Sequence, residues 1–388
     1  MLSSDGLPRR LTIPGGVTET ELQRLLEAPA AALGRGELVA FPTETVYGLG
    51  AGAHSAAAIG RVYEVKGRDG AKPLLFHVAT LAAARALTSD WSETAECLAA
   101  RFLPGPLTLI LPAAPQLDGH PALAGQGSVG IRIPRQRTAL ALIGQAGVPV
   151  CAPSANLSGR PSPTRAADVI ADLGARVDWV VDDGPTAVGL ESTVLDLASG
   201  PLPRILRPGA VSAEDIAAAL IACADPLTKQ PGWREQLEGQ GGSELRPRSY
   251  APRTPVWLFA STELRTDTGL LQFCDILREA GIRRAAWYLS DETRARIDVS
   301  GARLGPALPA AIWPGSQLVY GPRGDHEAAA RQLYACLRDL DRECPDVILV
   351  ESDGETAYRD RLEHAAVGRI VGGRLVFVDA DSDKGGPR

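Results

Sequence analysis

The sequence predicts an α/β protein built from two domains. Along most of the chain, short β-rich runs bounded by Gly, Pro or Ser alternate with helical patterns. At 388 residues, the chain is also long for a single hydrophobic core. The segment 225–254 is rich in Gly, Pro and polar residues and shows no periodicity. We therefore expect two α/β domains joined by a linker.

The first domain is expected to hold a mixed sheet. Residues 18–36 have the pattern of a helix that ends at Gly, 37–44 follow as a strand, and 55–67 form a helix capped by Ser55. Helices separate some of the later strands but not all of them, so a strict βαβ repeat is not expected. A capped helix from Ser212 closes this domain. The further strands are expected in PLLFHV, PLTLILP, SVGIRIP, VPVCAPS, DWVVDDG, ESTVLDL and RILRPG.

The second domain follows the linker and has a simpler pattern. Its apolar runs, such as PVWLFAS, RRAAWYLS and DVILVES, alternate with helical segments, which is typical of a smaller doubly wound, Rossmann-like sheet. We place the catalytic domain at 10–222, the linker or lid at 223–254, the C-terminal domain at 255–379 and a tail at 380–388.

Composition excludes several classes of protein. A formal net charge of −6 argues against a surface that binds nucleic acid over its whole extent, although a local basic cleft stays compatible. The six cysteines form no CxxC pair and have no histidine at ligand spacing, so we expect no metal site and a reduced, cytoplasmic protein. No signal peptide and no membrane-spanning run of about twenty apolar residues is expected.

The motif GLGAGA at 48–53 imitates a dinucleotide-binding fingerprint. Six residues separate it from the preceding strand core, and the following acid precedes the next strand instead of ending it. We therefore interpret it as a Gly-rich turn into the helix that begins after Ser55.

A basic cluster follows that helix. Lys66, Arg68 and Lys72 lie within seven residues, in a chain that contains only four lysines and thirty-six arginines. A solvated loop is the ordinary fate of such a charge run. A loop that combines compact ammonium groups with a guanidinium fork, however, suits a polyphosphate.

Three further sets of residues could bind anions. The loop 152–164 carries Ser and Asn side chains directly after a buried strand, a pattern that holds phosphate or ribose oxygens but also occurs in ordinary Ser/Pro loops. Arg132 lies in an apolar strand, where an unpaired charge is unfavourable. Ser192 and Thr193 enter another strand, beside Glu191, which could be a plain surface acid.

Histidine spacing gives no catalytic triad. There are five histidines, and His77 is the one embedded in a strand, where a core role is the commoner one. The residues thus indicate an anion-binding, nucleotide-binding α/β enzyme without covalent catalysis.

The order of the motifs adds a resemblance to a known family. FPTETVYGLG, YEVKGRDGAKPLLFHV, LPGPLTLIL, VGIRIP, APSANLSGRPSPT, GLESTVLDL and ILRPGAV follow one another. This series resembles the YrdC-like family of threonylcarbamoyl-AMP synthases in its long, two-domain form. The resemblance spans about 12–375 and is strongest over 38–212.

The resemblance implies a fold and a reaction. The implied fold is an open, twisted mixed sheet with a basic cavity, followed by a Rossmann-like domain. The implied reaction converts L-threonine, bicarbonate and ATP, accompanied by Mg²⁺, into L-threonylcarbamoyl-AMP and pyrophosphate. The implied downstream partner is a transferase complex that modifies the adenosine next to the anticodon of tRNA, with room for a weak tRNA contact and no membrane.

The resemblance also assigns site residues. It implies that Lys66 and Arg68 are catalytic and that Tyr250, in the linker, acts as a lid. Lys72 departs from the family's usual Asn, and Ser249 departs from its usual His before Tyr250. The implied L-threonine residues are Thr45, His77, Arg132 and Ser192. The implied ATP residues are Lys66, Arg68, Lys72, Ser128, Ser154, Asn156, Ser162 and Arg207.

Two alternatives stay open at this point. A plain RNA-binding module could use the same basic cavity without threonine-dependent ATP chemistry, although the net charge and the Ser/Thr-rich positions weigh against it. Carbamoyl-adenylate formation in hydrogenase maturation is a second alternative, but the accompanying acylphosphatase module and CxxC zinc fingers are missing from this sequence.

Overall fold

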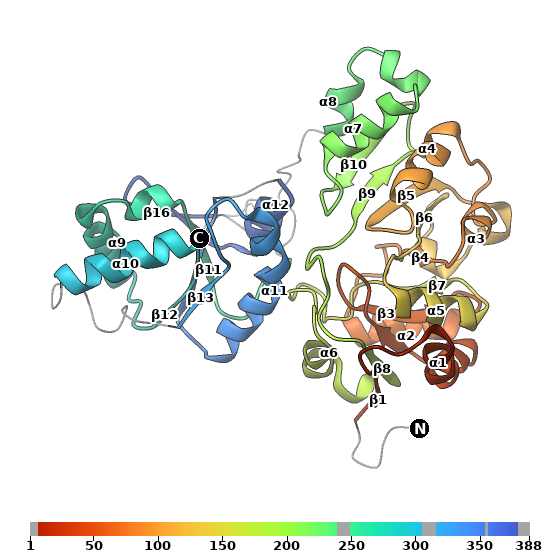
Figure 1. Ribbon diagram of the computed structural model, residues 1–388, viewed down its shortest axis with the longest axis horizontal. Helices are drawn as coiled ribbons and strands as arrows, with labels where there is room; N and C mark the ends of the chain where they lie inside the picture. The colour runs from red at the N-terminus through yellow and green to blue at the C-terminus, as the bar shows by residue number, and fades with distance from the viewer. Residues whose placement is uncertain (1–6, 239–248, 305–315, 354–355, 379–388) are drawn as a thin grey trace, which may run out of the picture. The chain divides into compact units, whose positions relative to one another are not determined.

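The chain divides into two compact units in the computed structural model, which describes residues 7–238, 249–304, 316–353 and 356–378 (Figure 1). The first unit comprises Met1–Ser158 and Ser162–Gly242, and the second comprises Gly159–Pro161 and Ser243–Arg388. Within the described ranges, no helix is both long enough and apolar enough to cross a membrane.

The first unit contains a ten-stranded mixed sheet, which confirms the predicted fold class. The strand order is β1-β8-β2-β3-β7-β4-β6-β5-β9-β10. Parallel pairs such as β4 with β6 stand beside antiparallel pairs such as β4 with β7. The strands are β1 (Arg9–Thr12), β2 (Val39–Phe41), β3 (Gly48–Gly52), β4 (Phe76–His77), β5 (Leu107–Pro112), β6 (Ser128–Arg132), β7 (Val150–Cys151), β8 (Trp179–Asp182), β9 (Thr193–Asp196) and β10 (Arg204–Arg207).

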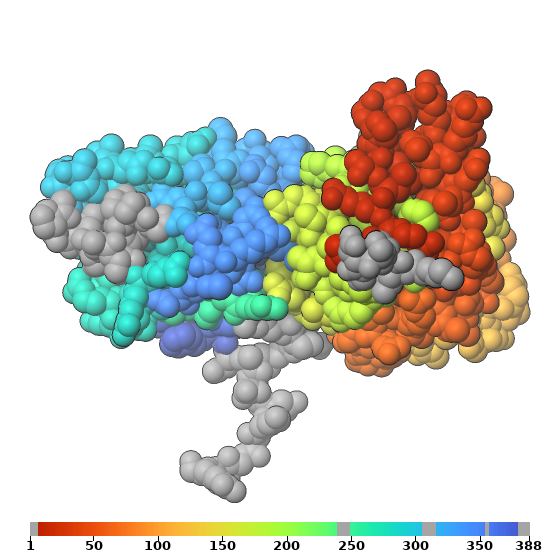
Figure 2. Space-filling view, turned by 90° about the horizontal axis from the view of Figure 1, so that it is seen from below, coloured from red at the N-terminus to blue at the C-terminus, as the bar shows by residue number. Residues whose placement is uncertain are grey.

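Helices cover both faces of this sheet. Along β2, Val39 and Phe41 belong to the core cluster that includes the apolar residues of α1 and α5, while Ala40 belongs to the larger cluster of the other face, which includes those of α2, α4, α6 and α7. In Figure 2, the red N-terminal segment lies against the yellow-green segment around β8, as the parallel pairing of β1 with β8 requires. The helices are α1 (Glu19–Gly34), α2 (Ala56–Lys66), α3 (Leu81–Arg85), α4 (Glu93–Phe102), α5 (Arg137–Ala146), α6 (Ala166–Leu173), α7 (Ala213–Ala222) and α8 (Trp233–Glu238).

Local capping explains where the helices beside the site begin and end. Ser55 accepts a hydrogen bond from the amide of Ala58 at the start of α2, and Gly67 ends the helix with a left-handed φ of 57°. Ser212 forms a capping box with Asp215 at the start of α7. The predicted Ser55 and Ser212 caps are confirmed.

The GLGAGA motif is not a turn, contrary to our expectation. Gly48–Gly52 forms β3, a fully buried strand inside the sheet. A Cβ atom on Gly50 would lie 2.8 Å from the ring of Phe41 and 2.9 Å from Val150, so glycine is required there by close packing. The glycines of this motif therefore allow close packing within the sheet and do not form a phosphate-binding turn.

The expectation of a fully reduced chain is wrong for one pair of cysteines. Cys97 on α4 and Cys223 at the end of α7 form a disulfide across a sequence separation of 126 residues. Because the two cysteines are so far apart in the sequence, local spacing could not predict their pairing. Cys151, Cys274 and Cys336 are buried and lie outside the disulfide, and Cys344 is exposed and also lies outside it.

Part of the segment expected as a linker is folded. It contains a short 3₁₀ helix, η4 (Pro226–Lys229), and then α8, whose Trp233 and Leu237 are buried in the core of the first unit. A helix of six residues is too short to show periodicity among Gly and Pro. Residues 239–248 of the expected linker and the expected tail at 380–388 lie outside the described residues.

The second unit is a doubly wound sheet of six strands in the order β13-β12-β14-β11-β15-β16. The first five strands are parallel, and β16 is antiparallel to β15. In Figure 1, α9 and α10 lie on one side of this sheet and α11 and α12 on the other. Its elements are β11 (Val256–Phe259), α9 (Asp267–Glu279), β12 (Ala285–Leu289), α10 (Asp291–Leu304), β13 (Gln317–Val319), α11 (His326–Arg342), β14 (Val347–Glu351), α12 (Thr356–Ala365), β15 (Gly368–Val371) and β16 (Arg374–Phe377).

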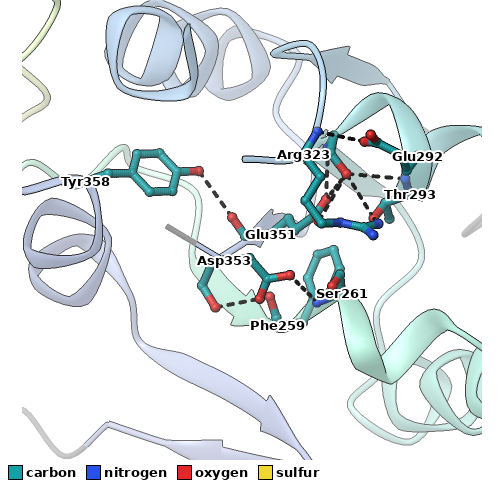
Figure 3. Close-up of polar contacts among 10 residues, drawn as sticks. Phe259, Ser261, Glu292, Thr293, Arg323, Glu351, Asp353 and Tyr358 are labelled. Atoms are coloured by element: carbon teal, nitrogen blue, oxygen red, sulfur yellow. Dashed lines mark hydrogen bonds and ion pairs between the residues drawn. The ribbon is translucent and has the colours of Figure 1, made fainter. Parts of the chain in front are cut away.

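A polar cluster closes the carboxyl ends of these parallel strands (Figure 3). Glu351, the last residue of β14, is fully buried, and Arg323 donates from Nε to its carboxylate at 3.2 Å. Ser290 adds its backbone amide at 2.8 Å and places its hydroxyl within 3.0 Å of both carboxylate oxygens. Nη2 of Arg323 donates to Thr293 at 2.8 Å. The carboxylate is thus fully hydrogen-bonded by the protein itself.

Candidate functional site

Two adjacent strand ends position the central pair of candidate residues. His77 in β4 and Arg132 at the end of β6 are register partners in a parallel pair. The amide of Val78 donates to the carbonyl of Arg132 at 3.1 Å, which holds the two strand ends together. The structure therefore brings together two residues that the sequence places far apart.

Arg132 meets a buried carboxylate that the sequence analysis did not single out. Its Nη2 lies 2.9 Å from Oε1 of Glu44, and the two residues are 4% and 5% exposed. Nε of Arg132 donates to the carbonyl of Gly105 at 3.3 Å, and Oε2 of Glu44 accepts from the amide of Arg135 at 3.1 Å. The pair thus fixes the loop between β2 and β3 against the end of β6.

The facing atoms of this pair lack good hydrogen bonds. Although Nη2 of Arg132 and Oε1 of Glu44 are close, they are not aligned as donor and acceptor, and neither has a hydrogen-bond partner among the described residues. Nδ1 of the adjacent His77 is buried and likewise unpartnered there. Because buried polar atoms are nearly always hydrogen-bonded, three such atoms together indicate a ligand position.

The charges at this position follow from burial. Burial by itself would raise the pKa of Glu44, but the charge and close approach of the Arg132 side chain, followed by the backbone amides of Glu44 and Arg135, outweigh it, so the net pKa is lowered and the carboxylate is ionised. Burial, followed by the nearby charge of Arg132, lowers the pKa of His77 to about 3. His77 is therefore a neutral imidazole near pH 7.

Thr45 belongs to the same loop as Glu44. Its hydroxyl lies 2.8 Å from that of Thr43, which in turn donates to the carbonyl of Val46 and closes a tight turn. The amide of Gly189 donates to the carbonyl of Thr45 at 3.1 Å, which connects this loop to the segment that precedes β9. Thr45 is fully buried.

Ser192 is held by two neighbours. Its hydroxyl lies 2.8 Å from that of Thr108 on β5, and Arg207 donates to its carbonyl at 2.9 Å and to its hydroxyl at 3.2 Å. A Cβ atom on Gly209 would come within 2.4 Å of the amide of Thr193, so only glycine lets the chain after β10 approach this closely. The predicted residues Ser192 and Arg207 are therefore in direct contact.

The basic loop and the Ser/Asn loop also meet. Lys66, at the end of α2, is buried, and its Nζ donates to the carbonyls of Ser154 and Asn156. Arg68 donates to the carbonyls of Lys72 and Pro73. The Lys72 side chain is exposed, so the three cations of this cluster occupy different environments.

The loop 152–164 is joined to the strand region by a buried carboxylate. Ser162 donates to Glu191 at 2.5 Å, and both residues are at most 4% exposed. The interpretation of Glu191 as a plain surface acid is therefore wrong, because its side chain pairs across the site. Ser128 begins β6, four residues before Arg132, and is half-buried.

Tyr250 lies with the second unit. Its ring stacks on that of Tyr334 with centroids 5.8 Å apart, and the guanidinium of Arg361 lies 4.9 Å from the ring centre. The amide of the neighbouring Ser249 donates to the carbonyl of His364 at 3.1 Å. Tyr250 has a left-handed φ of 58°, an uncommon conformation for a residue with a Cβ atom.

The structure brings several of the predicted site residues into contact in separate groups. His77 pairs with Arg132, Arg207 contacts Ser192, and Lys66 contacts Ser154 and Asn156. Sequence reasoning missed Glu44, although the unpaired arginine in an apolar strand already called for a buried counter-charge. Within the described ranges, no group of three His, Cys, Asp or Glu residues could hold a metal ion.

The chemistry of the arrangement suits small polar ligands. It offers a buried guanidinium, a buried carboxylate and a neutral imidazole in one cluster, and cations with backbone carbonyls in another. The described contacts give no hydrogen-bonded nucleophile, base and acid in the manner of a hydrolytic triad. Positioning and charge neutralisation are what such a site can supply.

Comparisons with known proteins agree with this chemistry. A family profile described as "Telomere recombination" matches residues 31–209, and one described as "Threonylcarbamoyl-AMP synthase, C-terminal domain" matches residues 211–367. A threonylcarbamoyl-AMP synthase of Bacillus subtilis (strain 168) is 37% identical over 350 residues, covering 88% of this chain and 93% of the relative. One of Pyrococcus abyssi is 33% identical over 367 residues, covering 93% and 99%.

A solved structure matches both units. The crystal structure of P. abyssi Sua5 complexed with L-threonine aligns with a TM-score of 0.73 at 30% sequence identity. The alignment covers 92% of this chain and 97% of that one. The likeness therefore extends over the sheet that carries the candidate site and over the second unit.

Proposed function

This chain belongs to the two-domain threonylcarbamoyl-AMP synthase family, and we propose from that premise how its site makes the product. It is an AMP-transferring enzyme that converts L-threonine, bicarbonate and ATP into L-threonylcarbamoyl-AMP and pyrophosphate. Relatives named for this activity match most of the chain, so the RNA-binding alternative is not favoured.

The observation that carries the site assignment is the buried Arg132, whose Nη2 has Glu44 as an ion-pair partner but makes no aligned hydrogen bond to a described residue. A carboxylate of L-threonine, placed beside it, would supply the missing acceptor in a charge-assisted hydrogen bond. In this proposal Thr45, His77 and Ser192 would offer hydroxyl and imidazole groups to the rest of the amino acid. This assignment puts L-threonine at the ends of β4 and β6.

ATP is proposed to bind at the other set of contacts. Lys66 and Arg68 would neutralise the phosphates, with Lys72 nearer the solvent. Ser154, Asn156 and Ser162 on the loop after β7 would hold the nucleotide, together with Ser128 and Arg207. Lys66 is supported most strongly, because a buried ammonium already binds two carbonyls of that loop.

The reaction needs no protein nucleophile in this proposal. The threonine amine adds to carbon dioxide and releases a proton, or condenses with bicarbonate and releases water, to give an N-carboxylate. An oxygen of this N-carboxylate attacks the α-phosphorus of ATP, and the bond from that phosphorus to the departing pyrophosphate breaks. The chain aligns the two reactants and neutralises the charge that develops on the phosphates. A neutral His77 adds no positive charge beside the amine.

Mg²⁺ is proposed to enter with ATP. Since the described residues contain no carboxylate group able to cage a metal, phosphate oxygens and water would hold it. The proposed downstream partner is a transferase complex that passes the threonylcarbamoyl group to tRNA, with room for a weak tRNA contact by the synthase. Tyr250 is proposed as the linker residue that closes on the site.

Pyrophosphate release tests the proposal directly. It should depend on L-threonine and on bicarbonate as well as on ATP, and release without threonine dependence would refute the assignment. Lys66→Ala and Arg68→Ala should each lower turnover by at least about one order of magnitude, because each removes a cation from the phosphates. Wild-type rates in both variants would refute the phosphate role.

A further inference from the structure

The proposed contacts of Arg132 with the substrate do not explain why a second buried charge, the Glu44 carboxylate, lies beside it. Glu44 neutralises Arg132, with Oε1 2.9 Å from Nη2, but the two atoms do not have hydrogen-bond geometry. Both atoms are buried and lack any other hydrogen-bond partner in the described part of the chain. One is a donor that needs an acceptor, and the other is an acceptor that needs a donor.

An α-amino acid carries the two complementary groups on one carbon. Its carboxylate is an acceptor for Nη2 of Arg132, and its ammonium is a donor for Oε1 of Glu44. Because the two protein atoms are neighbours, a single head group can satisfy both together. Nδ1 of His77 is the third buried atom without a hydrogen-bond partner in the described part of the chain. Because the imidazole is neutral, this atom needs no charged ligand group.

Net charge leads to the same ligand. Arg132 contributes one positive charge, Glu44 one negative charge, and His77 none. A zwitterionic amino acid adds no net charge to this buried group, whereas a simple carboxylic acid would leave one negative charge in excess. Burying an unbalanced charge is strongly unfavourable, so the pair should select zwitterions over anions.

We infer that Glu44 is a specificity-determining residue, which binds the α-ammonium of L-threonine while Arg132 binds its carboxylate. This inference rests on the proposed function, because it concerns the same amino-acid site. It goes beyond that function by assigning the ammonium to one residue and by predicting that an α-hydroxy acid binds less tightly than the amino acid.

Direct binding of two ligands tests the inference. Isothermal titration calorimetry would compare L-threonine with its α-hydroxy analogue, in which a hydroxyl replaces the ammonium. The wild-type protein should prefer threonine. Glu44→Gln should weaken threonine binding by about 10- to 100-fold, the effect of losing one buried charge-assisted hydrogen bond, and should bind the anionic analogue as well as or better than wild type.

The second unit provides a matched control. Glu351→Gln makes the same chemical change to a buried Glu that pairs with Arg at a strand end, and it should leave both affinities unchanged. Equal weakening of both ligands by Glu44→Gln would overturn the inference, because Glu44 would then act only by placing Arg132. No change with either ligand would overturn it as well.

Two further measurements keep the test decisive if Glu44→Gln does not fold. Glu44→Asp keeps the charge and should keep the preference for threonine at lower affinity. The wild-type protein alone is informative, since equal affinity for threonine and the hydroxy analogue would contradict the inference. A wild-type protein without threonine-dependent pyrophosphate release would instead refute the proposed function, so the two failures are distinguishable.

Discussion

Both units place an Arg–Glu pair at the end of parallel strands, and the two pairs differ in how completely they are hydrogen-bonded. Glu351 accepts from Arg323, from the Ser290 amide and from the Ser290 hydroxyl (Figure 3). The facing atoms of Glu44 and Arg132 have no such partners. The first arrangement is complete without a ligand, and the second is not.

The contrast separates a structural charge pair from a functional one. Buried ion pairs are weak evidence for either role, because their desolvation penalty can exceed their attraction. Unused hydrogen-bonding capacity is the more informative property, since the protein would otherwise satisfy it. On this criterion we propose the Glu44 pair as a ligand site and the Glu351 pair as a structural contact of the second sheet.

The largest expected difference between the two pairs is in turnover. Arg132→Gln should lower threonine-dependent pyrophosphate release by about 1,000-fold, because the substrate carboxylate loses its buried cation. Arg323→Gln should change it by less than about threefold in the folded protein, since Arg323 touches no proposed substrate. Initial rates at saturating ATP would measure both. Similar losses in the two variants would abolish the contrast.

The next expected effect is on the stability of the second unit. Glu351→Gln should lower the free energy of unfolding of that unit by about 3 kcal/mol, because it breaks a buried network that includes Ser290 and Arg323. Hydrogen exchange read at the amides of β12 and β14 would measure it, with β6 as the internal reference. Unchanged protection of β14 would show that the cluster is not structural.

A smaller effect is expected from the neutral imidazole at the site. The pKa of His77 is lowered to about 3 in the folded chain, whereas the unfolded value is near 6.5, so the unfolded state binds the proton first as the pH falls. Stability contributed by His77 is therefore present above about pH 6.5 and is lost toward pH 3. Between pH 7 and pH 5 the loss should be about 2 kcal/mol.

Urea unfolding at the two pH values would measure that loss. His77→Asn should remove this part of the pH dependence, whereas the same change at the exposed His54 should not. A pH dependence that persists in His77→Asn would show that another group is responsible.

The smallest effect extends the contrast to the lysines of one loop. Lys66 is buried and binds two carbonyls, while the Lys72 side chain is exposed. Lys72→Asn should alter the KM for ATP by less than about threefold, because interactions between solvent-exposed charges contribute little binding free energy. Comparing the KM for ATP of Lys72→Asn with that of Lys66→Met would measure this. A tenfold rise in the KM for Lys72→Asn would place Lys72 directly on the phosphates.

Local signals allowed much of the fold to be predicted. The Ser55 and Ser212 caps and the apolar runs were sufficient for their helices and strands, because these depend on neighbouring residues. Arg132 was noticeable because an arginine in an apolar strand demands a counter-charge. Glu44 was missed, since its burial depends on packing between distant segments. The Cys97–Cys223 disulfide was missed for the same reason.

The two-residue strand β4 has a mechanical consequence for the first unit. In the strand order, β4 alone separates β7 from β6, so one half of the ten-stranded sheet is joined to the other through Phe76 and His77. Within the sheet itself, shear between the halves would be taken up at this narrow strand. His77 on β4 and Arg132 on β6 are paired at this position, so a substrate that contacts both residues would strengthen the connection between the two strands.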